Sequence, residues 1–170
     1  PTNQPTLSAT GNVQTLTMNG SSNPSGNTLS LNSFTLNAST INISAGTITP
    51  DSVGGTVNVG TLLMTGGTLG GGSAGMTVNA TNVNLDTGGV TSNVTINASS
   101  SIVFNPGSPA SFGNNFTGAA ALNVRGGPVT LSGNNTYTGT TQVAGTLTAG
   151  SSTAIGSGTL FVLGGTVDLN

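Results

Sequence analysis

The chain has 170 residues and contains one basic and three acidic residues, so that 2 % of it is charged, where an ordinary soluble domain is about 25 % charged. Histidine and cysteine are absent, which excludes an imidazole base, a thiolate nucleophile and the common zinc and iron–sulfur sites. A single basic residue, Arg125, cannot neutralise the several phosphates on which nucleic-acid binding rests. We therefore expect no enzyme activity, no cofactor or metal, and no nucleic-acid partner.

Gly, Thr, Asn and Ser together make up more than half of the residues. Such a composition fits either a disordered low-complexity tract or a protein built of short strands. Disorder usually accompanies high net charge or many prolines, and this chain has a net charge of −2 and 7 prolines. Its apolar residues alternate with polar ones at a period of two, which is typical of half-buried strands. The sequence therefore predicts an all-β protein.

The alternation predicts short strands from one end of the chain to the other, separated by Gly-Gly, Asn-Gly, Ser-Gly and Asn-Pro turn pairs. No segment has the apolar spacing of an amphipathic helix. In chain order, the predicted strands centre on Leu16/Met18, Leu29/Leu31, Phe34/Leu36, Ile41/Ile43, Val57/Val59, Leu62/Met64, Met76/Val78, Val83/Leu85, Val94/Ile96, Ile102/Phe104, Leu122/Val124, Val129/Leu131, Val143/Leu147, Leu160/Val162 and Val167/Leu169.

Corresponding strand pairs recur at intervals of about 20 residues, for example from Leu62/Met64 to Val83/Leu85 and on to Ile102/Phe104. This interval is typical of one coil of a right-handed parallel β-helix, a solenoid. We expect one solenoid domain over residues 1–170, with about eight coils stacked about 4.8 Å apart. A β-sandwich, whose strands also recur at short intervals, is the alternative fold.

Stacked coils bring equivalent side chains into rows, and stacked asparagines can form amide ladders. A solenoid also needs its terminal coils covered, because an open coil presents unpaired backbone groups. No amphipathic helix is predicted at either end, and the C-terminal GTVDLN reads as an open strand with one charge. The opening PTNQPT, without an initiator methionine, is expected of a mature terminus after signal-peptide removal or of a fragment. No apolar run approaches 18 residues, so we expect no membrane-spanning helix.

Residues 129–169 contain a more specific pattern: a strand, SGNNTYTGTTQV, GTL, a small-residue turn with two spaced glycines, another strand, and GGTVDL. This segment resembles the autotransporter-associated β-strand repeat of Gram-negative passenger domains. The resemblance implies a parallel β-helix outside a bacterial cell and, since the repeat is a scaffold, no particular activity. The matching positions are Ser132, Gly133, Asn135–Gly139, Thr140, Thr141, Val143, Gly145–Leu147, Gly156, Gly158, Gly164–Thr166, Asp168 and Leu169. Ala144 stands where the family usually has one more residue before GTL.

The few residues able to do chemistry all have simpler interpretations. Asp51 follows a proline in a turn, Asp86 precedes a Gly-Gly corner, and Asp168 belongs to the repeat. Arg125 follows a strand and precedes a Gly-Gly-Pro corner, and Tyr137, the only tyrosine, is expected to be a packing residue. Three acids without a neighbouring base do not predict a glycosidase or lyase site. We therefore expect no catalytic residues.

Residues 105–120, NPGSPASFGNNFTGAA, form the longest interruption of the alternation and predict a protruding loop. Phe112 and Phe116 are unfavourable to expose together. Either the loop folds over the rod and buries them, or they form a contact surface. In the second case they are the predicted assembly contacts.

Three functions from different classes fit these features. The first is an extracellular or cell-surface structural protein whose solenoids stack head to tail into a fibre. The second is a stalk or adhesin segment of an autotransporter-like secreted protein, with a glycan or host-surface contact left open. The third is an ice-binding solenoid, suggested by the Thr-X-Thr pairs Thr15/Thr17, Thr47/Thr49 and Thr146/Thr148, whose intervals are irregular. We expect the first, with a second copy of the chain as its partner.

Overall fold

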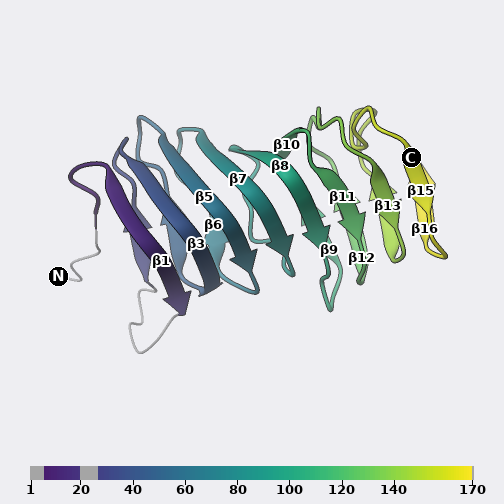
Figure 1. Cartoon of the computed structure of the whole chain (residues 1–170), viewed down its shortest axis with the longest axis horizontal. Helices are drawn as coiled ribbons and strands as arrows, with labels where there is room; N and C mark the ends of the chain where they lie inside the picture. Colours follow the sequence, from purple (N-terminus) through teal and green to yellow (C-terminus); the bar gives the residue numbers. More distant parts are fainter. Residues whose placement is uncertain (1–5, 20–26, 170) are drawn as a thin grey trace.

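The computed structural model describes residues 6–19 and 27–169, and every regular element in these ranges is a β-strand. The parts 1–5, 20–26 and 170 of the expected domain lie outside the described residues. In Figure 1 the long strands lie side by side along a rod, and the short strands lie behind them. The described residues include no apolar helix of the length needed to span a membrane.

Each long strand pairs in parallel with the next one along the chain, and a short strand follows most of them. The long sheet consists of β1 (Gly11–Asn19), β3 (Thr35–Ala45), β5 (Gly55–Met64), β7 (Met76–Leu85), β8 (Val94–Phe104), β11 (Ala121–Val124), β13 (Thr141–Val143) and β15 (Leu160–Val162), with β10 (Asn115–Gly118) also beside β8. The short strands are β2 (Thr28–Ser30), β4 (Thr47–Thr49), β6 (Thr68–Leu69), β9 (Ala110–Phe112), β12 (Pro128–Leu131), β14 (Thr146–Ala149) and β16 (Thr166–Leu169).

This arrangement is a parallel β-solenoid with coils of about 20 residues, as the sequence predicts, and it has about seven turns where the sequence predicts about eight. The β-sandwich alternative is wrong, because sandwich sheets are antiparallel and every named pairing here is parallel. Paired residues of β3 and β5 lie 21 residues apart in the sequence, for example Asn37 and Asn58. The first coil is longer, since Asn12 and Asn37 lie 25 residues apart.

The long sheet bends within each coil. β8 pairs with two separate strands, through Ile96↔Phe116 in β10 and Ile102↔Leu122 in β11. In β5 the bend falls at Gly60, where an added Cβ would lie 2.7 Å from the backbone oxygen of Ser39, the residue at the same position of β3. Only glycine fits that close approach.

The bend gives the solenoid three faces. Face 1 consists of residues 35–38 of β3 and the residues that pair with them in the other strands of the long sheet, from β1 to β10. Face 2 consists of residues 40–45 of β3 and the residues that pair with them in the other strands of the long sheet, from β1 to β15. Face 3 contains the short strands, whose two sheets meet at residues 88–90: Leu69 bridges to Val90, and a Cβ on Gly88 would lie 3.1 Å from the backbone oxygen of Ser111.

The core consists of rows of apolar side chains that point inward from the three faces. Alternate residues of a strand point to opposite sides, so the predicted alternation becomes an apolar interior and a polar exterior. One row of face 2, for example, contains Leu16, Ile41, Leu62, Val83, Ile102, Leu122 and Leu160, with the buried Thr141 as a polar member between the last two.

Outside this core, face 1 carries a ladder of asparagine side chains, which confirms the expectation of stacked amides. Each Nδ2 donates to the Oδ1 of the asparagine in the preceding coil: Asn37 to Asn12 (2.8 Å), Asn58 to Asn37 (2.8 Å), Asn79 to Asn58 (2.9 Å) and Asn97 to Asn79 (3.2 Å). All four bonds point the same way along the rod. The ladder therefore fixes the side-chain orientation of five successive coils.

Replacing one ladder residue should destabilise the rod measurably. Asn58→Ala removes a donor to Asn37 and an acceptor from Asn79, which we expect to cost about 1–3 kcal/mol of unfolding free energy. Asn84→Ala, on the outer side of face 2 in β7, is the matched control and should cost less than about 0.5 kcal/mol. Urea unfolding measures both, and equal losses would contradict a stabilising ladder.

Candidate functional site

The acidic residues are dispersed along the solenoid. Asp51 closes a turn, in which the backbone N–H of Val53 donates to its Oδ1 at 2.7 Å. Asp86 follows β7, and Asp168 lies on the exposed side of β16 beside Thr148. Residues 6–19 and 27–169 contain no cluster of three or more acidic, His or Cys side chains that could hold a metal ion. The structure thus brings none of the sequence-derived acids together.

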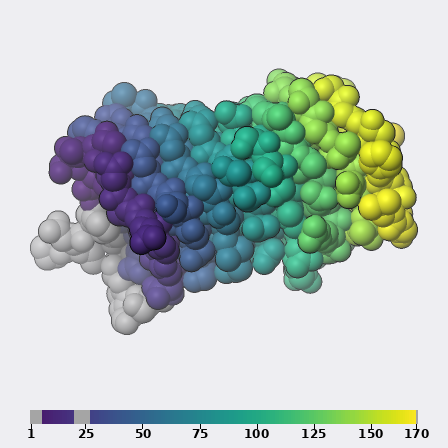
Figure 2. Space-filling model, in the orientation of Figure 1, coloured from purple at the N-terminus to yellow at the C-terminus, as the bar shows by residue number. Residues whose placement is uncertain are grey.

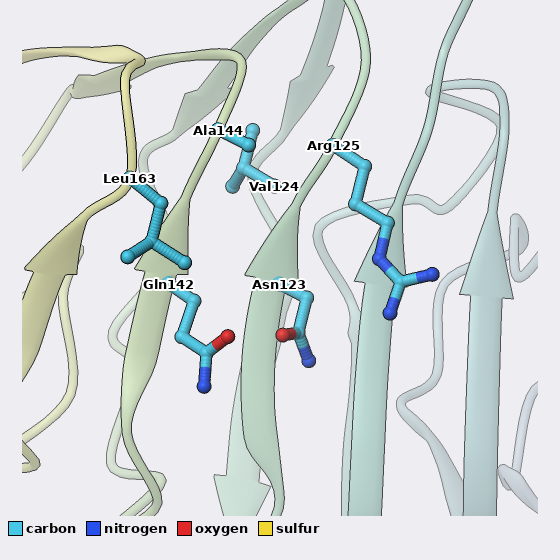
Figure 3. A pocket seen from close by; sticks show the side chains of 6 residues that line it. All are labelled: Asn123, Val124, Arg125, Gln142, Ala144 and Leu163. Carbon is cyan, nitrogen blue, oxygen red and sulfur yellow. The ribbon is translucent and has the colours of Figure 1, made fainter.

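Arg125 borders a shallow hollow of about 100 Å³ on the outside of face 2, lined also by Asn123, Val124, Gln142, Ala144 and Leu163. Figure 3 shows the Arg125 guanidinium directed away from Gln142 and Leu163, toward the preceding coils. Arg125 forms no ion pair with any described residue. Small-molecule sites usually enclose about 300–1,000 Å³, so this hollow is too small and too open to surround a ligand.

Tyr137 is a packing residue, as expected. Its side chain is fully buried, and its hydroxyl forms a 2.7 Å hydrogen bond with Thr141 Oγ1, which is also buried. Burial raises the pKa of Tyr137 above its usual value, and the hydrogen bonds with Thr141 and the backbone of Gly156 act in the opposite direction. The sole tyrosine is therefore part of the core and offers no platform for a ligand.

Phe112 and Phe116 are also buried, which corrects their prediction as assembly contacts. Together with Phe104 they form an aromatic cluster, with ring centroids 4.7, 5.4 and 6.3 Å apart. Each occupies a place in an inward row: Phe116 stacks on Ile96, and Phe112 stacks on Leu131. Of the two alternatives for these residues, burial is the one observed.

The protruding loop predicted at 105–120 needs the same correction. Most of this segment continues the coil as β9 and β10, and the remaining residues form short connections at 105–109, 113–114 and 119–120. Both prolines and Gly107 lie between β8 and β9, and Gly113 lies between β9 and β10. The inward rows continue through Phe112 and Phe116.

The C-terminal coil exposes apolar side chains at positions that face inward. Its inward positions Val162 and Leu169 are 51 % and 67 % exposed, whereas their partners Val143 and Ala149 in the preceding coil are 0 % and 6 % exposed. Leu160 and Val167 are half-buried in the same two strands. Figure 2 shows this last coil forming one end of the rod. We call the four residues Leu160, Val162, Val167 and Leu169 the C-terminal end surface.

The opposite end also exposes part of an inward row. Val13 in β1, which is paired with Ala38, is 42 % exposed, and Leu16 is half-buried. Within the described residues, no strand pairs with β1 on the side away from β3 or with β15 on the side away from β13. The sequence indicated an open C-terminal strand from GTVDLN, but it gave no sign that Val13 would be exposed, because its alternation resembles that of a buried strand.

Comparison with known proteins adds no further evidence: no family model, curated protein or solved structure matches the chain significantly. The C-terminal end surface, together with the exposed Val13, is therefore the candidate functional site.

The buried tyrosine predicts a loss of stability in alkali. Because the pKa of Tyr137 is raised in the folded state, the unfolded chain loses this proton first, and the unfolding free energy falls as pH rises above about 10. The chain has no Cys and no other Tyr to add a slope in this range. Urea unfolding at pH 8, 10 and 11 should show the decrease.

Tyr137→Phe is the control for this prediction. It removes the titrating hydroxyl and should therefore remove the alkaline slope, while it lowers stability at pH 8 by about 1–3 kcal/mol because Thr141 Oγ1 loses its buried partner. An unchanged alkaline slope in this variant would show that another group causes the loss.

Proposed function

We propose that this chain is a structural protein of the outer surface of a bacterial cell, whose solenoid subunits stack head to tail into a filament. The observation that supports this proposal best is the exposure of Val162 and Leu169 at positions that every earlier coil buries. A fully buried Val or Leu contributes about 1.5–3 kcal/mol. Half-exposed side chains leave much of this stabilisation unused, and a further coil placed on this end would recover it.

The backbone supports the same contact. Within the described residues, β15 and β1 each have one edge that pairs with no strand, and the N–H and C=O groups of that edge favour pairing with another strand. All pairings in the long sheet are parallel, so a second copy placed with its β1 on β15 continues the sheet in the same direction. Contact between two different ends is heterologous and, unless the rotation closes a ring, propagates into a filament.

Charge does not oppose the contact. The net charge is −2, so repulsion between subunits is weak. Since there is little charge to screen, we expect assembly to change little between low and molar salt.

The bacterial surface is proposed from the resemblance of residues 129–169 to the autotransporter-associated repeat. The same resemblance favours a second candidate function, a stalk or adhesin segment of an autotransporter-like secreted protein. In that case the rod acts as a spacer, and copies of it do not need to associate. Assembly of the isolated chain distinguishes the two proposals.

The test uses substitutions at each end. Val162→Asp places a charge in the C-terminal end surface and should abolish the filaments that the unaltered chain forms in negative-stain microscopy. Phe161→Asp is the matched control: Phe161 lies in the same strand and is 46 % exposed, but it points outward, so filaments should persist.

The two ends are then tested together. Val13→Asp disables the N-terminal end and Val162→Asp the C-terminal end, so each variant alone should be monomeric by analytical ultracentrifugation. An equimolar mixture should give dimers, because one intact end of each kind remains. An unaltered chain that stays monomeric at high concentration would overturn the filament proposal and favour the stalk.

A further inference from the structure

The outer side of face 1 carries a regular two-column array of polar side chains. One column contains Thr35, Thr56, Thr77 and Thr95, and the neighbouring column contains Asn12, Asn37, Asn58, Asn79 and Asn97. Each of four successive coils thus presents one Thr-X-Asn unit at the same position, on β3, β5, β7 and β8. We call these two columns the Thr-Asn array.

One column of the array is held by hydrogen bonds, and the polar groups of both columns are available. The asparagine ladder fixes one column, since each bond joins one coil to the next at 2.8–3.2 Å. Each amide keeps a second N–H and a further acceptor site that the ladder does not use. In the described part of the chain, the hydroxyls of Thr35, Thr56, Thr77 and Thr95 form no hydrogen bond with protein. The array therefore presents ordered donors and acceptors to solvent.

The spacing of the array is set by the β-solenoid itself. Neighbouring coils repeat at about 4.8 Å, and alternate residues of one strand lie about 6.6 Å apart. The Thr and Asn columns keep one register over four coils without a charged or aromatic side chain among them. The result is an uncharged two-dimensional lattice of hydroxyl, methyl and amide groups.

The Thr-X-Thr pairs identified in the sequence do not form such a lattice. Thr47/Thr49 stack on Thr68 and its neighbours in face 3, where the next short strand ends at Leu69. Thr146/Thr148 stack on Thr166/Asp168, which introduces a charge. Thr15/Thr17 stack on Thr40/Asn42 and then on Thr61/Leu63.

We propose that the Thr-Asn array binds the surface of crystalline water. An ice surface is a flat, uncharged lattice of oxygen atoms whose repeats have the size of the β-solenoid spacings. Hydroxyls in a regular register and hydrogen-bonded amides can hold first-shell water in matching positions, and ordered water of this kind bonds nearly as well as a direct contact. A polysaccharide surface fits less well, because the array offers no aromatic side chain on which a sugar ring could stack. The array lies on the side of the rod, so this proposal does not depend on end-to-end stacking.

The test compares one substitution in the array with the same substitution on another face. Thr77→Tyr places a large ring in the centre of the array, and Thr148→Tyr places it on the outer side of face 3, in β14. Tyrosine is favourable in strands, so both variants should fold. Thr77→Val, which keeps the shape and removes only the hydroxyl, is a second variant with less risk to folding. Circular dichroism and the melting temperature check the fold of each.

Inhibition of ice recrystallisation and shaping of single ice crystals are the measurements. The unaltered chain and Thr148→Tyr should act at the same concentration, and Thr77→Tyr should require at least about tenfold more protein, the change given by about 1.4 kcal/mol of lost binding. Thr77→Val should lie between them.

Three results would overturn the proposal. The first is that the unaltered chain has no effect on ice. The second is that both tyrosine variants lose the effect equally, and the third is that the chain leaves ice unaffected but binds crystalline chitin or cellulose in a way that Thr77→Tyr abolishes. The last result would assign the array to a polysaccharide surface.

Discussion

The whole structure depends on one constraint, the parallel hydrogen-bonded register that places each coil on the one before it. Because the register repeats, a side chain in one coil meets its equivalent in the next, and apolar positions become continuous inward rows. The same repetition turns single asparagines into a ladder and single threonines into a column. A chain with almost no charge can be built in this way, since stability comes from rows of Leu, Ile and Val and from backbone pairing. The inward rows reach the surface at Val162 and Leu169, which are 51 % and 67 % exposed.

Much of this architecture could be predicted from the sequence, because its signals are periodic. Alternation over residues such as Val57/Val59 and Leu62/Met64 locates strands, and a recurrence of about 20 residues distinguishes a coil from a sheet of hairpins. The sequence does not predict the bend at Ser39 and Gly60, because the bend shifts the alternation by one residue within a single strand and the pattern then resembles two strands. For Phe112 and Phe116 the surrounding Gly and Pro residues predict a loop, and only the register with Ile96 and Leu131 reveals that they continue inward rows.

The Thr-Asn array and the exposed end residues differ in how well the sequence predicts them. The Thr-Asn array is present in the sequence as the triplet Thr-X-Asn at 35–37, 56–58, 77–79 and 95–97, which recurs at the coil interval. The Thr-X-Thr pairs do not reveal it, because the second column uses asparagine, whose amide also bonds to its neighbours along the rod. The exposure of Val13 and Val162 cannot be recognised from the sequence. Val13 alternates with polar residues as buried strand residues do, and Val162 lies in the four-residue apolar run LFVL, which is typical of a fully buried strand.

The central claim is that β15 of one copy continues into β1 of the next, in the register of the sheet. The outward row that contains Thr17 and Phe161 tests it directly, because the chain has no native cysteine. In a continued register these two positions lie on adjacent strands, within the Cα separation of about 4.4–6.8 Å that a disulfide requires. Oxidation of the double variant Thr17→Cys/Phe161→Cys should give a ladder of covalent oligomers on a non-reducing gel, and neither single variant should give more than a trace of dimer. A double variant that stays monomeric, or single variants that dimerise as readily through like ends, would contradict head-to-tail continuation of the solenoid.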